Sequence, residues 1–175
     1  MGGDKAAVEV RGSTMLERVA TVLDPVVDRM VVLGPPRQGW ECWPDEIDAP
    51  GPLAGIATAL RRIGEGRALV LAVDQPFASS RTMQELVGIE SELPVVPVDR
   101  AGTRQVTCAL YPARIAEEAH EEAIAGGSIQ SLLDRVAFEA VTPDTWSSWG
   151  EDGRSWFSVD TSEDLTEGLR RFNSP

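Results

Sequence analysis

Lysine and histidine are almost absent from this sequence. Among its 175 residues Lys5 is the single lysine and His120 the single histidine, while the other 15 basic residues are arginine. His120 lies in the acidic run Glu117–Glu122, which supports neither a Ser-His-Asp nor a Cys-His arrangement, so we interpret it as part of a solvated helix face. A lone lysine in a chain that otherwise uses arginine indicates a position that requires an ammonium group.

The sequence also has few cysteines, no long apolar segment and no excess of positive charge. Cys42 and Cys108 lie far apart without the spacing of metal ligands, so we interpret them as buried thiols of a protein from a reducing cytoplasm. No apolar run approaches the roughly 18 residues that a membrane span needs, and the polar start from Met1 to Val10 predicts no signal peptide. The net charge of −12 argues against binding to nucleic acid or to an anionic membrane, because an acidic surface repels phosphate groups.

Strand and helix patterns alternate along the chain. Predicted strands cover residues 29–33, 69–73, 93–98, 106–111 and 138–141. Predicted helices cover 56–63, 81–90 after a cap at Ser79 or Ser80, 113–125, and 129–136 after a cap at Ser128. Two more run from a cap at Thr14 to Leu23 and from a cap at Thr161 or Ser162 to Phe172. Residues 142–154 are predicted to form a tryptophan-containing loop. The alternation predicts one α/β domain with a mostly parallel sheet.

The segment around which we expect the domain to be organised is the apolar run Leu69–Phe77, which stops at Asp74 and is broken by Pro76. Valine and leucine without polar alternation predict a strand that is covered on both faces. Ligands of open α/β sheets bind beyond the carboxyl ends of the strands, so Asp74 is placed to bind a metal ion. Spacing alone leaves one alternative open, which is an aspartate that caps the following helix.

Several ordered stretches of the chain resemble the molybdenum cofactor guanylyltransferases, which attach GMP to molybdopterin. Met1–Lys5 resembles the end of that family's N-terminal glycine-rich loop, and Gly51–Gly55 matches its Gly-Pro-Leu-Ala-Gly motif. Val73–Phe77 is similar to its metal-binding segment and Phe157–Asp164 to its closing motif, while residues 104–111 resemble one of its strands. Order and spacing agree over essentially the whole chain.

The resemblance implies both a fold and a reaction. The implied fold is a three-layer α/β/α sandwich with a mostly parallel, Rossmann-like nucleotidyltransferase sheet, formed as a single domain by residues 1–175. In the implied reaction GTP binds with Mg²⁺, the molybdopterin phosphate attacks the α-phosphorus, and pyrophosphate leaves. The implied partners are these small molecules and, as candidates, other proteins of molybdenum cofactor biosynthesis in the cytoplasm.

The resemblance also implies the residues of the site. Lys5 and Asp74 are the implied catalytic residues, because an ammonium neutralises triphosphate charge and a carboxylate binds Mg²⁺. Asp160 is the implied second metal ligand. Asp45 would accept hydrogen bonds from guanine N1–H and the exocyclic amine. The implied nucleotide-binding residues are Lys5, Asp45, Gly51, Pro52, Leu53, Ala54 and Gly55.

Each of these assignments has a structural alternative. The alternatives are a solvent-exposed Lys5, a purely structural turn at Gly51–Gly55, an ordinary acidic loop residue at Asp45 and a helix-capping Asp160. Two interpretations are open for three tryptophans, Trp146, Trp149 and Trp156. Their side chains pack in the core, which we favour, or they stack on a pterin.

Two departures from the family's pattern matter. Ser158 and Asp160 stand where the family has asparagines, so a cytidylyltransferase or a phospholactate guanylyltransferase is an alternative. The family's first strand and most of its glycine-rich loop are missing, so we interpret the chain as N-terminally incomplete, with a truncated, non-catalytic relative as the alternative. On this interpretation strand 69–73 has an open edge, and the chain as given is expected to be poorly soluble or inactive.

Overall fold

The computed structural model describes residues 4–172, in which a four-stranded sheet forms the centre. The strand order is β5 (Arg67–Leu71), β7 (Cys108–Pro112), β6 (Val95–Pro97) and β8 (Glu139–Val141). β7 pairs antiparallel with β5 and β6, whereas β6 and β8 pair in parallel, so three of the four strands run in the same direction. Two short pairs lie outside this sheet, the antiparallel β1 (Glu9–Val10) with β2 (Ser13–Thr14) and the parallel β3 (Val32–Leu33) with β4 (Cys42–Trp43).

Helices connect the strands. The α-helices are α1 (Met15–Leu23), α2 (Pro52–Ile63), α3 (Ser80–Gly88), α4 (Ala116–Ile124), α5 (Ile129–Arg135), α6 (Pro143–Ser148) and α7 (Ser162–Arg171). Three short 3₁₀ helices are η1 (Lys5–Ala7), η2 (Ala113–Ile115) and η3 (Arg154–Trp156). Within the described part of the chain no helix has the length and apolar character of a membrane span.

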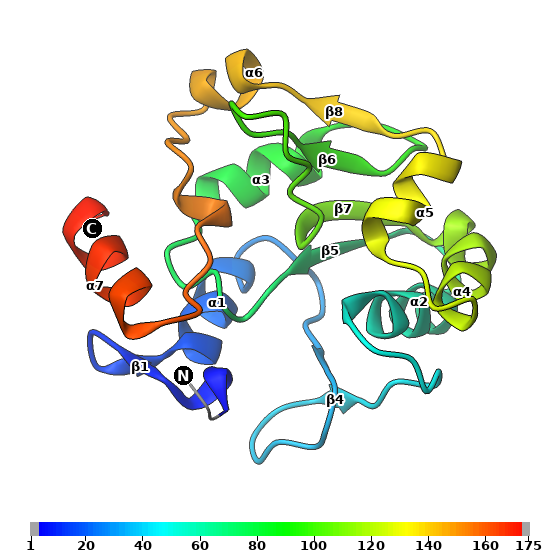
Figure 1. The fold of residues 1–175 in the computed structure, drawn as a ribbon, viewed down its shortest axis with the longest axis horizontal. Coiled ribbons are helices and arrows are strands. Elements are labelled where there is room, and N and C mark those ends of the chain that lie inside the picture. The colour runs from blue at the N-terminus through cyan, green and yellow to red at the C-terminus, as the bar shows by residue number, and fades with distance from the viewer. Residues whose placement is uncertain (1–3, 173–175) are drawn as a thin grey trace.

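The two faces of the sheet are covered by different helices. On β7, Ala109 and Tyr111 pack with α2, α4 and α5, while Cys108 and Leu110 pack with α1, α3 and α6. This follows from the period of two along a strand, which sends successive side chains to opposite faces. The result is a three-layer α/β/α sandwich, as the sequence predicted (Figure 1).

A third, smaller core lies under α7. It contains side chains from the N-terminal hairpin, α1, the loop after β5 and the C-terminal segment, namely Val10, Met15, Phe77, Val159 and Phe172. Figure 1 shows α7 beside the N-terminal hairpin, although these two elements are far apart in the sequence. This core therefore joins the beginning and the end of the described chain.

Several helix starts agree with the sequence prediction. Thr14 accepts a hydrogen bond from the backbone of Glu17, whose side chain bonds back to Thr14, so the two residues form a capping box. Ser79 caps α3, and Ser128 and Thr161 form capping boxes at α5 and α7. These contacts involve residues three positions apart, which is why the local pattern is sufficient to predict them.

The strand that carries Asp74 differs from its prediction. β5 ends at Leu71 rather than at residue 73, because a turn begins there: the Gln75 N–H donates to the Ala72 carbonyl (3.1 Å), and the Gln75 side chain accepts from the Ala72 N–H (3.2 Å). The prediction that both faces of this strand are covered is confirmed, because Ala68 and Val70 pack against one core and Leu69 and Leu71 against the other. Most residues of β5 are only half-buried, and within residues 4–172 this strand pairs with β7 alone.

Two helices also differ from their predictions. α2 begins at Pro52 rather than Ile56, because Pro52 occupies its first turn after Gly51. Residues 143–148, predicted as loop, form α6, which Thr142 caps and Pro143 begins. The Trp146 indole N–H donates to the Val98 carbonyl (2.9 Å), so a tertiary contact stabilises this short helix.

Candidate active site

Asp74 lies in a tight turn at the carboxyl end of β5. The turn is held by Gln75, whose buried side chain accepts from the Ala72 N–H (3.2 Å) and donates to the Thr107 hydroxyl (3.4 Å). α3 is capped by Ser79, so the alternative that Asp74 caps this helix is wrong. The Asp74 side chain is 26% exposed and is therefore available for a ligand.

Asp160 is brought to the same place by a backbone contact between distant segments. The Val159 N–H donates to the Asp74 carbonyl at 2.8 Å, and the Val159 side chain is fully buried. Thr161, not Asp160, caps α7, so the helix-cap alternative for Asp160 is wrong. The N–H of Asp160 donates to Asp164 (3.1 Å), and this leaves the 60% exposed carboxylate at the mouth of the site.

Lys5 lies between these two carboxylates. Its ammonium bonds to Asp160 Oδ1 and lies 3.5 Å from Asp74 Oδ2. Asp4 begins η1 by accepting the Ala6 N–H (3.1 Å), and Arg37 holds the Asp4 carboxylate through two bonds of 2.5 and 2.8 Å. Lys5 is 34% exposed, so the alternative of a freely solvated lysine does not describe it. Met1, Gly2 and Gly3 of the predicted motif lie outside the described residues.

The electrostatics of this cluster favour charged side chains. The hydrogen bond to Asp160 raises the pKa of the Lys5 ammonium, with the nearby Asp74 charge acting in the same direction and desolvation acting against both. The same bond lowers the pKa of the Asp160 carboxyl. The ammonium and the Asp160 carboxylate are therefore both charged near neutral pH.

Asp45 and the Gly51–Gly55 motif lie together in a second group. A Cβ atom added to Gly55 would lie only 3.0 Å from Asp45 Oδ1, so the carboxylate rests directly against the first turns of α2. The loop behind Asp45 is tied to the same helix, because the Glu46 N–H donates to the Thr58 hydroxyl (3.0 Å). Among the described residues no hydrogen bond or ion pair joins this group to the Lys5 cluster.

The residues of the motif have different surroundings. Gly51 precedes α2 with a positive φ of 88°, a conformation that favours glycine, and it makes no side-chain cap. Leu53 and Ala54 are buried and pack in the core, whereas Gly51 and Pro52 are exposed. The first N–H groups of α2 thus have no side-chain cap.

The Asp74 and Asp160 pair fits a Mg²⁺ site. Mg²⁺ prefers oxygen donors and is often held by one or two protein carboxylates together with substrate phosphates. Both carboxylates approach the same cation, the Lys5 ammonium, so both face one point in space. No group of three or more His, Cys, Asp or Glu side chains suited to a metal lies within residues 4–172, and the pair is therefore the available donor set near β5.

Sequence reasoning missed Arg37, which anchors the segment that carries Lys5. Its only sequence signal is its place in a turn rich in glycine and proline, which does not specify a partner. The remaining candidates have ordinary positions. Trp146 is buried, as the core interpretation predicted, and His120 lies half-buried against Arg61. Cys42 and Cys108 are both free, and Cys108 is buried.

Comparison with known proteins gives matches over most of the chain. A family described as the MobA-like NTP transferase domain matches residues 1–141. A molybdenum cofactor guanylyltransferase from Desulfosudis oleivorans is 26% identical over 171 residues, which cover 94% of this chain and 85% of the relative. A probable molybdenum cofactor guanylyltransferase from Natronomonas pharaonis is 31% identical over 188 aligned positions, covering 97% of this chain and 90% of the relative.

A solved structure shares the fold. Molybdopterin-guanine dinucleotide biosynthesis protein A from Archaeoglobus fulgidus superposes with a TM-score of 0.83 at 22% identity, covering 97% of this chain and 90% of that protein. The α/β/α architecture is thus shared with that protein, and the match to the family extends over all four strands of the central sheet. The chain therefore belongs to the MobA-like NTP transferase family.

Proposed function

We propose that this protein transfers GMP from GTP to the phosphate of molybdopterin and releases pyrophosphate. The observation that carries the proposal is the convergence of Lys5, Asp74 and Asp160 at the carboxyl end of β5. The family supports nucleotidyl transfer in general. The choice of nucleotide and acceptor is supported by the relatives that are named molybdenum cofactor guanylyltransferases.

The reaction needs positioning and neutralisation of charge. A phosphate oxygen of the acceptor bonds to the α-phosphorus of GTP, the bond from that phosphorus to the bridging oxygen breaks, and pyrophosphate leaves with the electron pair. Lys5 supplies a compact positive charge to the triphosphate, which matters in a chain of net charge −12. Asp74 and Asp160 would hold Mg²⁺, which when bound neutralises phosphate charge and orients the leaving group.

The second group of residues is proposed to bind the base and the nucleoside. The Asp45 carboxylate accepts from guanine N1–H and the exocyclic amine, two donors that adenine does not present on that edge. Gly51 is exposed and lacks a side chain, so the nucleoside can approach the backbone at the start of α2 closely, while the missing side chain of Gly55 makes room for Asp45. Because Asp45 rests against Gly55, the same helix positions both features.

We place this reaction in the cytoplasm, where other proteins of molybdenum cofactor biosynthesis would supply the acceptor. Two free cysteines within the described chain are consistent with a reducing compartment. The acidic charge is consistent with small-molecule substrates rather than nucleic acid.

The experiment that tests the proposal measures transfer of radiolabelled GMP from GTP to molybdopterin in the presence of Mg²⁺. Asp74→Asn is expected to abolish transfer and to keep the fold, because it removes one charge with little change in volume. The matched control is Asp28→Asn, at an exposed turn after α1, which is expected to retain full transfer. Activity of Asp74→Asn near that of the unmutated protein would refute the metal assignment. A preference for CTP would select the cytidylyl alternative.

A further inference from the structure

Glu151 is a buried carboxylate outside the cluster described above. It lies between α6 and η3, is 5% exposed, and makes no ion pair within residues 4–172. One oxygen accepts from the Thr82 hydroxyl (2.6 Å) and the Ser155 hydroxyl (2.5 Å). The other accepts backbone N–H groups at 3.0, 2.7 and 3.3 Å from Asp152, Gly153 and Ser155. Five donors thus surround one buried carboxylate.

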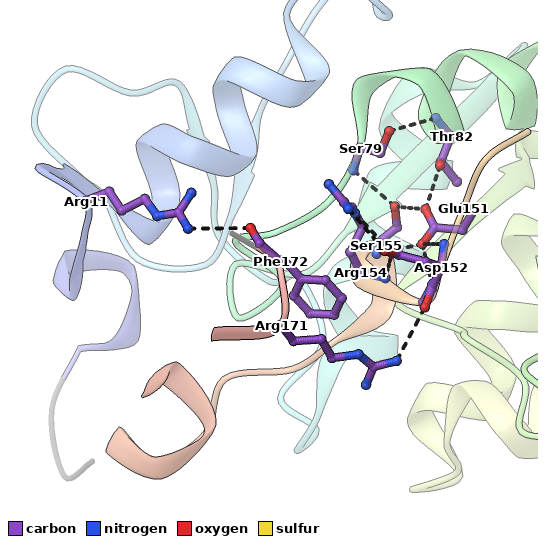
Figure 2. Close-up of polar contacts among 10 residues, drawn as sticks. Arg11, Ser79, Thr82, Glu151, Asp152, Arg154, Ser155, Arg171 and Phe172 are labelled. Carbon is purple, nitrogen blue, oxygen red and sulfur yellow. Dashed lines mark hydrogen bonds and ion pairs between the residues drawn. The ribbon is translucent and has the colours of Figure 1, made fainter. Parts of the chain in front are cut away.

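These donors come from two different segments (Figure 2). Thr82 lies in the first turn of α3, which follows the Asp74 loop, while residues 152–155 lead toward Asp160. Burial of a carboxylate is costly unless hydrogen bonds compensate for the lost water, so removal of this acceptor leaves donors from both segments unsatisfied. Glu151 therefore acts as a bridge between the two segments.

The Ser155 hydroxyl extends this bridge. It donates to Glu151 and accepts the backbone N–H of Ser79 at 3.0 Å, and the Ser79 side chain in turn accepts from the N–H of Thr82. Ser79, Thr82, Ser155 and Glu151 thus form a closed hydrogen-bonded ring (Figure 2). A closed ring fixes the position of each segment relative to the other.

A second tie, a backbone hydrogen bond, joins the same two segments closer to the cluster of Lys5, Asp74 and Asp160. The Val159 N–H donates to the Asp74 carbonyl at 2.8 Å, and between the two ties Phe77 and Phe157 contact edge to face with ring centroids 6.1 Å apart. The segments 74–79 and 155–159 are thus joined at both ends with an aromatic pair between them. Asp74 and Asp160 project just beyond the second tie.

We propose that Glu151 is a positioning residue that sets the separation of the Asp74 and Asp160 carboxylates. The proposal rests on the proposed function, in which this pair holds the metal ion. Without Glu151 the Thr82 and Ser155 hydroxyls lose their shared acceptor. The segments are then joined by the Ser79–Ser155 hydrogen bond, the Val159–Asp74 hydrogen bond and one aromatic contact, so the two carboxylates can separate. Residues that hydrogen-bond directly to metal ligands typically change metal affinity by about 10–100-fold when mutated, and Glu151, which acts through the backbone, is expected at the lower end of this range.

The test is Glu151→Gln, which preserves the shape of the side chain but replaces one acceptor oxygen with an amide NH2 group. This NH2 group then faces hydroxyl or backbone N–H donors that it cannot accept from. The probe is Mn²⁺ alone, which uses the same oxygen donors as Mg²⁺ and whose free concentration is measured by electron paramagnetic resonance. We expect the Kd for Mn²⁺ to rise roughly 10-fold or more. We also expect faster hydrogen exchange at the Val159 N–H, because the tie next to Asp74 then opens more often.

The matched control is Glu122→Gln in α4. Glu122 is also buried, at 8% exposed, and its carboxylate accepts from Arg135 (2.6 Å) far from β5's carboxyl end. This variant is expected to lower the melting temperature and leave the Kd for Mn²⁺ unchanged, which separates a general loss of stability from loss of positioning. If Glu151→Gln does not fold, Ser155→Ala removes one hydroxyl from the ring and is expected to raise the Kd by a smaller factor.

An unchanged Kd in a folded Glu151→Gln or Ser155→Ala protein would overturn the proposal, and so would an equal rise in Glu122→Gln. Asp74→Asn distinguishes this failure from failure of the proposed function. If Asp74→Asn abolishes Mn²⁺ binding while the ring variants bind normally, only the positioning role is overturned. If Asp74→Asn binds Mn²⁺ as the unmutated protein does, the metal site fails and the positioning role fails with it.

Discussion

Substitution of Gly168 by alanine should destabilise the protein through a single close contact in α7. Gly168 is buried against the ring of Phe77, and an added Cβ would lie 2.8 Å from Cζ and 3.0 Å from Cδ2, with Cε2 nearer still. The ring has little room to retreat, because Phe172 lies 5.5 Å away and Phe157 6.1 Å away between centroids. The methyl group therefore has to displace either α7 or the Phe77 loop.

The expected magnitude is the difference between two opposing effects. Overpacking of a well-packed core typically costs about 1–3 kcal/mol. Alanine is a better helix former than glycine, which returns up to about 1 kcal/mol in a helix interior. A contact as close as this one belongs to the upper part of the overpacking range, about 2–3 kcal/mol, and subtraction of about 1 kcal/mol for helix propensity leaves a net loss in free energy of unfolding of about 1–2 kcal/mol. For a domain of this size each kcal/mol corresponds to about 2–4 °C, so the melting temperature should fall by about 2–8 °C.

The assay is a thermal melt followed by circular dichroism, with Gly88→Ala as the matched control. Gly88 is the last residue of α3, and a Cβ added there meets no atom within 4 Å. Gly88→Ala is therefore expected to leave the melting temperature unchanged or to raise it slightly. A Gly168→Ala protein that melts at or above the temperature of the unmutated protein would show that Phe77 yields freely and would refute the packing argument.

Three further predictions concern the site. Asp45→Ala should reduce the preference for GTP over ATP in competition binding, and equal competition by the two nucleotides on the unmutated protein would contradict the assignment of Asp45 to guanine. Gly55→Ala should weaken GTP binding several-fold, because its Cβ would lie 3.0 Å from Asp45 Oδ1 and push the carboxylate away, and it should also lower the melting temperature, because the same Cβ would lie 3.3 Å from Leu33 Cβ. Titration calorimetry with GTP measures the change in affinity, and unaltered affinity in the folded variant would contradict the prediction. The hydrogen bond from Lys5 lowers the pKa of the Asp160 carboxyl in the folded protein, so this carboxyl binds its proton more tightly in the unfolded chain. The ion pair therefore stabilises the fold at a pH above the ordinary carboxyl pKa, and this stabilisation is lost as the pH falls through the lowered pKa. The difference in melting temperature between the unmutated protein and Asp160→Asn should therefore shrink as pH falls from about 5 to about 2, whereas a constant difference would count against the ion pair.

Local interactions account for what could be predicted from the sequence. The caps at Thr14, Ser79 and Thr161 were predictable because each depends on residues only a few positions away. The alternation of helices and strands, and the placement of Asp74 after a strand, were predictable from apolar periodicity. The resemblance to a family then led to Lys5 and Asp160, which no periodicity distinguishes.

The sequence by itself determined the order of the elements, most of their helix starts and the chemical types present at the site. Only the tertiary structure decided that Lys5 lies between two carboxylates, one of them 155 residues away, because packing under α7 closes the chain on itself. It also decided where β5 ends, that residues 143–148 are helical, and that Glu151 is buried. The physical reason is the same in each case. A backbone carbonyl or a side-chain hydroxyl from a distant segment supplies the deciding contact, and the sequence near each residue does not specify that partner. The partners are the Thr107 hydroxyl for the turn after β5, the Val98 carbonyl for α6 and the Thr82 hydroxyl for Glu151.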